Sequence, residues 1–372
     1  MNKIKVFLQS PWKFLDSPYY KYLIKTPPKE IEYLNIEDQK GAITQKRKFL
    51  LLNFGKKIIR KTLNFVGVSI PNTKQTNYAK KFDLIHCAHC LSLNKTPWVA
   101  DFESWWQMWV SVNPKKIEKE KVKKILLDKN CKKIMPWTEG AKIDLIKLFP
   151  EIKKKLEVVY PAISKKEEKK RNNKDRVEIL FVGRYFYEKG GLHALEAIDR
   201  LTTKYKQVYA TFISITPKQI LKKYSQNKKI RFLNLMNQSK LFKEIYPNAD
   251  IFLYPGYSDT FGFTFLEAFS FGIPVVTMQG FARNEIIEEG KTGFIIDCPY
   301  WTSNELYKKC HRLNKEELDW IDKIIKKLSL LIENPSLRKK MSKNCRDVIK
   351  TGKFSIKERN KKLKKIYKEA IR

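Results

Sequence analysis

Short apolar runs alternate with longer segments of helical periodicity along the whole chain. The runs Ile4–Gln9, Phe82–His86 and Cys131–Pro136 are short enough to predict strands. Pro114–Asn130 is charged but has apolar residues at helical spacing, which predicts a helix. Another helix is expected from Thr138, because a threonine side chain can cap the first turn.

The same alternation starts again after residue 176. Strands are expected at Val177–Val182, Val208–Ser214, Lys229–Asn234, Ile251–Tyr254, Val275–Thr277 and Gly293–Ile296, and helices at Gly191–Thr203 and Phe265–Phe271. Ser164–Arg176 contains no apolar residue, which is typical of a linker. Glu157–Tyr160, a short β-like run, ends the first half at Pro161. The pattern predicts an α/β protein with two doubly wound parallel-sheet domains, whose ligands bind at the carboxyl ends of strands.

Composition narrows the class of protein. Apolar residues make up 42% of the 372 residues and aromatic residues 13%, which excludes a disordered tail. The six cysteines are unevenly spaced and do not form a disulfide framework. No run approaches the roughly 20 apolar residues of a spanning helix, and the amino terminus lacks a signal-peptide pattern. We therefore expect a cytoplasmic protein, either soluble or peripheral at the inner face of the membrane.

The net charge of +37 is spread over both halves of the chain, with one denser stretch. Lys40–Phe82 carries eleven basic residues and no acidic one, interleaved with leucine and phenylalanine. The segment Lys40–Lys81 suits an anionic surface such as a membrane, or it forms a helix whose basic face is solvated. A nucleic-acid-binding protein would also be basic, but no recognition motif is present and the charge is diffuse, so no nucleic-acid partner is expected.

The first informative loop is Phe181–Gly191. Gly183 permits a tight turn after the strand, and Arg184 and Lys189 lie in the loop before the next helix. An arginine fork and a lysine point charge near a helix start can hold a diphosphate. The alternative is a surface loop with two solvated cations.

The second informative loop lies within Ile251–Val276. Asp259 and Glu267 are eight residues apart, and Gly262 between them lets the backbone approach a ligand closely. The two carboxylates can accept hydrogen bonds from the vicinal hydroxyls of a ribose or a hexose. Alternatively, Asp259 caps the helix and Glu267 is a solvated helical glutamate.

Together these loops resemble the retaining glycosyltransferases of family 4, also called glycosyl transferases group 1. That family's signature is an acidic residue, seven residues and a glutamate, embedded in P-S-x-x-E-G-F-G-x-x-x-x-E-A-x-A-x-G-x-P-V-V. This chain reads Pro255, Gly256, Tyr257, Ser258, Asp259, Thr260, Phe261 and Gly262, and then Glu267, Ala268, Gly272 and Pro274–Val276. The family's V-G-R-x-x-x-x-K-G corresponds to Val182–Arg184 and Lys189–Gly190. The resemblance covers about Val177 to Asp297 and departs at Asp259, where glutamate is usual, and at Thr260, where glycine is common.

The resemblance implies a GT-B fold of two Rossmann-like domains that face each other across a cleft. The implied domains are 1–163 on the acceptor side, a linker at 164–176, and 177–353 on the donor side. Residues 354–372 would form a helix that crosses back to the first domain.

The implied reaction is retaining transfer of a sugar from a nucleotide-diphosphate sugar, most often UDP- or GDP-linked, to an acceptor hydroxyl of a glycan, lipid-linked or small molecule. Arg184 and Lys189 would stabilise the departing diphosphate, Glu267 would hold the ribose hydroxyls and Asp259 those of the hexose. The resemblance implies no metal and no further cofactor, because the two cations replace the metal. The donor-binding set is Gly183, Arg184, Lys189, Asp259, Thr260, Phe261, Gly262, Phe263, Thr264, Phe265 and Glu267.

In the first domain the resemblance keeps a D-x-I-H pattern at Asp83–His86, and a family histidine in this region contacts the donor sugar. His86 and His89 both qualify. The interleaved Cys87–Cys90 segment also suggests zinc, but no second cluster completes a tetrahedral site. Asp101 and Glu103 are candidate acceptor-side carboxylates.

Tryptophans gather near these carboxylates. Trp98 and its neighbours Trp105, Trp106 and Trp109 stack a sugar or touch lipid in one interpretation and form core in the other.

Two further classes of function keep the same loops. A nucleotide-sugar-binding protein without transfer activity would retain both loops, and the Asp259 departure is the residue that points to it. A hydrolase or a phosphorylase could also use this scaffold. Turnover with an acceptor separates these possibilities from a transferase.

Overall fold

The computed structural model describes residues 3–9, 18–36, 69–111, 118–167, 175–298, 313 and 315–372, and the structural statements below refer to these residues. The chain divides into two compact units. The first comprises Met1–Ala162 together with Lys353–Arg372, and the second comprises Ile163–Gly352. The carboxyl-terminal segment therefore belongs to the first unit.

The first unit is built on a five-stranded parallel sheet. Its strands are β1 (Ile4–Gln9), β2 (Ile31–Leu34), β5 (Leu84–Ala88), β7 (Trp98–Phe102) and β9 (Cys131–Pro136), in the order β2-β1-β5-β7-β9. β5 and β7 are buried at every position, as expected for central strands covered on both faces. The strand order reverses between β1 and β5, so the loops that follow these two strands lie at a topological switch point.

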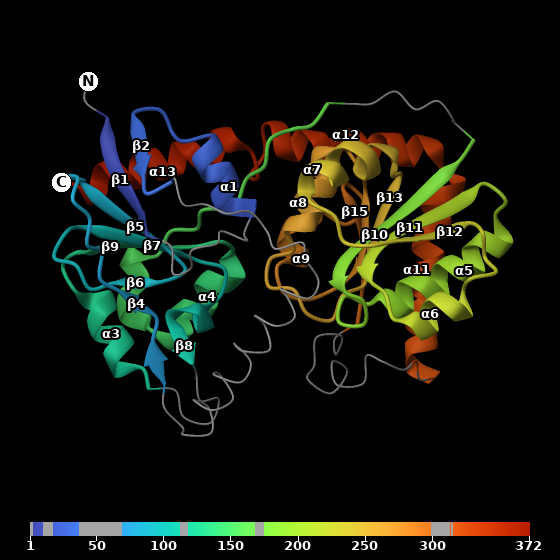
Figure 1. Ribbon diagram of the computed structural model, residues 1–372, viewed down its shortest axis with the longest axis horizontal. Coiled ribbons are helices and arrows are strands. Elements are labelled where there is room, and N and C mark those ends of the chain that lie inside the picture. The colour runs from blue at the N-terminus through green and yellow to red at the C-terminus, as the bar shows by residue number, and fades with distance from the viewer. Residues whose placement is uncertain are drawn as a thin grey trace. The chain divides into compact units, whose positions relative to one another are not determined.

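Helices and short strand pairs complete the first unit. They are α1 (Pro18–Lys25), β3 (Ile70–Pro71), β4 (Thr73–Lys74), β6 (Leu91–Ser92), η1 (Trp105–Met108), β8 (Trp109–Ser111), α3 (Glu120–Leu127), α4 (Glu139–Leu148), η2 (Pro150–Lys155) and α13 (Ile356–Ala370). β3 pairs with β8 and β4 pairs with β6. Thr138 caps α4 by accepting a hydrogen bond from the Ala141 amide at 3.0 Å, as its position predicts. α13 packs on the sheet, where the Tyr367 hydroxyl lies 2.9 Å from that of Tyr33 on β2 (Figure 1).

The second unit contains a six-stranded parallel sheet. Its strands are β10 (Val177–Tyr185), β11 (Val208–Ile215), β12 (Ile230–Leu233), β13 (Ile251–Tyr254), β14 (Val275–Met278) and β15 (Gly293–Ile296). They are ordered β12-β11-β10-β13-β14-β15, and each neighbouring pair is parallel. The order reverses between β10 and β13, which is the Rossmann arrangement.

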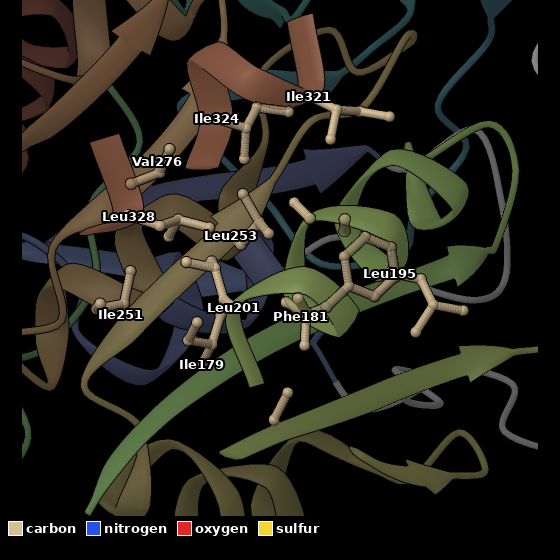
Figure 2. Packing of buried hydrophobic residues seen from close by; sticks show 14 of the residues in the cluster. Ile179, Phe181, Leu195, Leu201, Ile251, Leu253, Val276, Ile321, Ile324 and Leu328 are labelled. Carbon is tan, nitrogen blue, oxygen red and sulfur yellow. The ribbon is translucent and has the colours of Figure 1, made fainter. Parts of the chain in front are cut away.

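Helices supply the rest of the second unit. They are α5 (Gly191–Lys204), α6 (Lys218–Lys223), α7 (Gln238–Lys240), the π-helical turn η3 (Leu241–Ile245), η4 (Tyr246–Asn248), α8 (Phe263–Ser270), α9 (Arg283–Ile286), α11 (Lys315–Glu333) and α12 (Pro335–Lys350). Figure 2 shows Ile321, Ile324 and Leu328 of α11 packed with aliphatic residues of the sheet and of α5. This core holds the strand ends, and therefore the loops after them, in fixed positions.

The two parallel sheets confirm the predicted fold class, and every predicted strand except one is present. Glu157–Tyr160 forms no strand, because only Leu156 beside it makes an isolated bridge, to Ile134. The tight turn expected at Gly183 is also wrong, because β10 continues through it to Tyr185 with an irregularity in the pairing.

Candidate functional site

The two loops singled out by the sequence follow neighbouring strands at the centre of the second unit's sheet. The loop with Lys189 follows β10, and the loop with Asp259 follows β13. β10 and β13 flank the point where the strand order reverses. Ligands of open α/β sheets bind in the crevice at such a point, so the fold itself places these loops at a binding position.

Lys189 and Asp259 meet across the two loops. The lysine Nζ lies 3.3 Å from Asp259 Oδ2 and donates a hydrogen bond to the Ser258 carbonyl at 2.6 Å. The Tyr254 hydroxyl donates to Asp259 Oδ2 at 2.5 Å, and burial, aided by Asp259, raises the pKa of this tyrosine well above its usual value. The side chains of Lys189 and Asp259 are each about one-fifth exposed. A cation and a carboxylate therefore stand side by side at the surface of the site, each able to bind a ligand.

Two glycines allow this approach of the loops. A Cβ at Gly183 would lie 2.7 Å from the Lys189 Cβ, so the missing side chain leaves room for the stem of the lysine. Gly190 has a φ of +73° and caps α5, and a Cβ there would lie 1.9 Å from the Pro255 carbonyl oxygen. Close packing, more than turn formation, explains the glycine at 183.

Arg184 lies at the end of β10 and is partly exposed. The predicted donor loop continues with Thr260, which is partly exposed, and with Gly262, which caps α8 at a φ of +81°. Gly262 is the N-cap, so the interpretation of Asp259 as a helix cap is wrong. Of the remaining predicted contacts, Phe261 and Phe265 are buried, whereas Phe263 and Thr264 are partly exposed.

Glu267 is buried on α8, with 6% of its surface exposed, so it is not a solvated helical residue. Gln238 Nε2 donates to Glu267 Oε1 at 2.5 Å, and the Tyr246 hydroxyl donates to Oε2 at 2.9 Å. Two neutral donors therefore orient the carboxylate and satisfy one lone pair on each oxygen. Gln238 and Tyr246 were not predicted as site residues.

Arg283, also not predicted, is fully buried next to the donor loop. Its Nη2 donates to the Gly256 carbonyl at 2.5 Å, and its Nη1 lies 3.2 and 3.3 Å from the carbonyls of Met278 and Gln279. The guanidinium thus joins the loop after β13 to the loop after β14. Burial lowers its pKa from the usual range, and the fields of Tyr254 and Asp259 act in the opposite direction.

The structure distinguishes the two candidate histidines of the first unit. His86 lies within β5 and is completely buried, with Nδ1 2.6 Å from the Tyr367 hydroxyl and Nε2 3.0 Å from Asp101 Oδ2. His89 follows β5 at the switch point of its sheet, and 17% of its side chain is exposed. Only His89 of these two has ring surface that a ligand can touch.

The acceptor-side prediction needs correction at two of its three residues. Trp98 is 1% exposed and belongs to the core of the first unit, and Asp101 is fully buried among Tyr20, His86 and His89. Neither side chain presents surface to an acceptor, so we no longer assign them that role. Glu103 is partly exposed and stays a candidate.

The other three tryptophans differ in exposure. Trp109 is buried in the core, Trp105 packs against it, and Trp106 is 40% exposed.

Among the described residues no group of three or more histidine, cysteine or acidic side chains is arranged to hold a metal ion. In the same part of the chain no helix is long and apolar enough to span a membrane. The basic segment Lys40–Lys81 lies outside the described residues up to position 68, so membrane docking through it stays a prediction.

Comparison with known proteins agrees with the geometry. Residues 162–320, most of the second unit, match the family model "Glycosyl transferases group 1". A relative, sulfoquinovosyl transferase SQD2 of Arabidopsis thaliana, is 29% identical over 160 residues, which are 38% of this chain and 30% of the relative. The match thus spans less than a third of that relative's length.

Solved glycosyltransferase structures share the fold over the whole chain. A glycosyltransferase from Rickettsia africae superimposes with a TM-score of 0.61 at 14% identity, covering 100% of both chains. Anabaena Alr3699/HepE, solved in complex with UDP, gives a TM-score of 0.57 at 12% identity over 98% of each chain. The chain therefore has a GT-B-like fold.

Proposed function

We propose that this protein is a retaining glycosyltransferase of family 4, which transfers a sugar from a nucleotide-diphosphate sugar to an acceptor hydroxyl. The observation that carries the proposal is the meeting of Lys189 and Asp259 at 3.3 Å, in the loops that follow the two strands at the strand-order reversal. Glu267 lies on α8, the helix that begins after the Asp259 loop, and its carboxylate is oriented by Gln238. The family match over residues 162–320 supports sugar transfer as the general activity.

Each group at the site has a chemical task in this proposal. Arg184 and Lys189 bind the diphosphate and stabilise the negative charge that develops as it leaves, so that no metal ion is needed. Glu267, whose carboxylate is oriented by Gln238 and Tyr246, accepts hydrogen bonds from the ribose hydroxyls. Asp259 accepts from the hexose hydroxyls, and the leaving phosphate helps to deprotonate the acceptor on the same face.

The first unit supplies the acceptor side. We assign the donor-sugar contact to His89 instead of His86, because His86 has no exposed surface and both its ring nitrogens are engaged. The acceptor is a hydroxyl of a glycan, of a lipid-linked sugar or of a small molecule, and the partly exposed Glu103 is the candidate carboxylate on the acceptor side.

A thermal-shift screen against UDP, GDP, ADP and their common sugars tests the donor site. A ligand that binds only the folded state raises the melting temperature by mass action. We expect stabilisation by one nucleotide series, with UDP the first probe. Arg184→Ala, Lys189→Ala and Glu267→Gln should each lose that stabilisation, whereas Lys222→Ala, which removes an exposed lysine of α6, should keep it.

Turnover then separates a transferase from a binding protein. With the stabilising nucleotide sugar and a panel of acceptors, the parent should release nucleoside diphosphate, and Lys189→Ala should lower kcat by about 10²–10³. Retention is read from the anomeric configuration of the product by NMR. Binding without release of nucleoside diphosphate would favour the nucleotide-sugar-binding alternative, and no stabilisation by any nucleotide would contradict the donor site itself.

A further inference from the structure

A buried carboxylate at the end of β7 is shared by three side chains of the first unit. Asp101 is fully buried, and its Oδ1 accepts a short hydrogen bond from the Tyr20 hydroxyl on α1. Its Oδ2 lies 3.0 Å from His86 Nε2. Its Oδ1 also lies 3.7 Å from His89 Nδ1, slightly too far for a hydrogen bond. Asp101 therefore lies between His86, which is within hydrogen-bond distance of it, and His89, whose Nδ1 is slightly beyond that distance.

Hydrogen-bond contacts at both ring nitrogens hold His86 in one orientation. Its Nδ1 lies 2.6 Å from the hydroxyl of Tyr367 on α13, and that hydroxyl lies 2.9 Å from the hydroxyl of Tyr33 on β2. Burial raises the pKa of Tyr20 and of Tyr367 well above the usual value, so both remain hydrogen-bond donors at neutral pH. The cluster ties β2, β5, β7 and α13 around the Asp101 carboxylate and limits its movement.

His89 is held at its backbone and along its ring faces, but one of its ring nitrogens is unpaired. Its φ is 55°, its amide donates to the Asp101 carbonyl at 3.2 Å, and its own carbonyl accepts from Asn72 Nδ2 at 2.6 Å. The ring lies against Tyr20 and Trp137, with centroids 5.3 and 4.9 Å away. Nδ1 is buried without a hydrogen-bond partner, although a carboxylate oxygen is 3.7 Å away. An unpaired buried nitrogen is costly, and hydrogen bonds of catalytic groups are often long before the substrate binds.

We propose that Asp101 is a positioning residue that orients the His89 ring for a hydrogen bond with a sugar hydroxyl. A small rotation of the His89 ring brings the Nδ1 proton onto Asp101 Oδ1, which selects the tautomer with the proton on Nδ1. Nε2 is then free of its proton and accepts a hydrogen bond from a sugar hydroxyl. This inference rests on the proposed function for the sugar contact, but the pairing of Asp101 with His89 can be measured without turnover.

The ionisation of His89 reports the pairing. Burial lowers the pKa of His89 below 6.5, and the Asp101 carboxylate partly offsets this effect. The polar and titratable groups that face the ring are Tyr20 from α1, Asp101 from β7 and His86 from β5, and Trp137 contributes an uncharged ring. Among these groups it is Asp101 that favours the charged imidazole, so removing its charge should lower the pKa of His89.

Asp101→Asn is the first variant, because the amide keeps the shape and an accepting oxygen but removes the charge. We expect the His89 pKa, followed by NMR of the ring in the full chain with UDP present, to fall below the parent value. In turnover, kcat should fall about ten- to a hundredfold, while the KM for the donor changes less than threefold. Asp144→Asn removes an exposed carboxylate of α4 and should change neither quantity.

Tyr20→Phe should shift the His89 pKa in the opposite direction, and it still tests the proposal if Asp101→Asn does not fold. Removing the hydroxyl leaves Asp101 Oδ1 without its short hydrogen bond, so the oxygen becomes fully available to His89. The His89 pKa should then rise and the ring should spend more time with its proton on Nδ1. A purely structural cluster would instead shift the His89 pKa in the same direction in both variants.

The outcomes are separable from those of the proposed function. An unchanged His89 pKa in Asp101→Asn, or a folded Asp101→Asn enzyme with the parent kcat, would overturn the positioning role. If the parent itself turns over no nucleotide sugar, the proposed function fails, but opposite pKa shifts in the two variants would still establish that Asp101 sets the state of His89.

Discussion

The position of Lys189 depends on the absence of a side chain at Gly183, which packs against it. A Cβ at Gly183 would lie 2.7 Å from the Lys189 Cβ, near the backbone, where the lysine side chain has little freedom to move aside. Gly183→Ala should therefore displace Lys189 from Asp259 and weaken UDP binding by about tenfold, which is roughly 1.4 kcal/mol. Isothermal titration of UDP into the variant measures this.

Gly290→Ala is the matched control for a glycine effect. Gly290 has a φ of +72°, and a Cβ there meets nothing within 4 Å. The control should lose about 1 kcal/mol of stability through backbone strain and bind UDP like the parent. Parent-like UDP affinity in Gly183→Ala would show that Lys189 does not need the space.

The Arg283 guanidinium is expected to need its fork shape as well as its charge. It reaches Gly256 with one terminal nitrogen and the Met278 and Gln279 carbonyls with the other. A lysine has one nitrogen and cannot serve both loops, so Arg283→Lys should lower the free energy of unfolding by about 2 kcal/mol. Arg200 pairs at the exposed surface with Glu196 and Asp322, so Arg200→Lys should cost much less in the same urea titration.

At the residue scale, the sequence predicts the groups that lie close together along the chain and misses those brought in from elsewhere. Lys189, Asp259 and Glu267 stand in local motifs at the ends of predicted strands. Gln238 and Tyr246 lie 29 and 21 residues before Glu267, and no local pattern marks them. The burial of Asp101 was missed for the same reason, because its partners come from α1 and β5.

The helix α13 is anchored to the first unit by a small group of charges. Lys364 and Lys368 both pair with Glu30, at 2.5 and 2.7 Å, and their hydrogen bonds lower the pKa of Glu30 to about 2. Glu30 is partly exposed, so solvent screens the pair and its contribution to stability is modest. Glu30→Gln should lower the melting temperature slightly at neutral pH.

The pH dependence of that change is specific. The folded pKa of Glu30 is depressed, so its stabilisation is complete above about pH 4.5 and is lost as the pH falls toward 2. The difference in melting temperature between the parent and Glu30→Gln should therefore shrink across this window, and 1 M salt should shrink it at neutral pH. Glu32→Gln, an exposed change on β2, should show no such window. A difference independent of pH and salt would exclude the ion pairs as the anchor.

At the element scale, buried strands are predictable from the sequence because they are continuous apolar runs. The residues at which the strands end are harder to predict. β1, β9, β13 and β15 begin and end where the sequence predicts. β10 runs three residues beyond its apolar run, through Gly183 and Arg184, because pairing with β11 continues after an irregularity. Tertiary pairing, which the local sequence does not reveal, decides such ends.

On the scale of the whole molecule, each unit contains a histidine that burial makes harder to protonate. Burial lowers the pKa of His89 in the first unit and of His193 in the second. Both unfolded side chains take up a proton near pH 6.5, whereas the folded ones do so only at lower pH. Below pH 6.5 the unfolded state holds more protons, so the stability of each unit falls as the pH falls.

His193 provides the clearest measurement of this effect, because it is fully buried on α5. Its Nε2 lies 3.6 Å from Glu317 Oε1 of α11 and 3.3 Å from the Tyr257 hydroxyl of the donor loop. One histidine changes the stability by at most about 1.4 kcal/mol per pH unit. Calorimetry at pH 7.5, 6 and 5 should show a smaller loss of melting temperature in His193→Gln than in the parent, and a smaller loss still when His89→Gln is added. Equal losses in all three proteins would mean that neither histidine contributes to the destabilisation by acid.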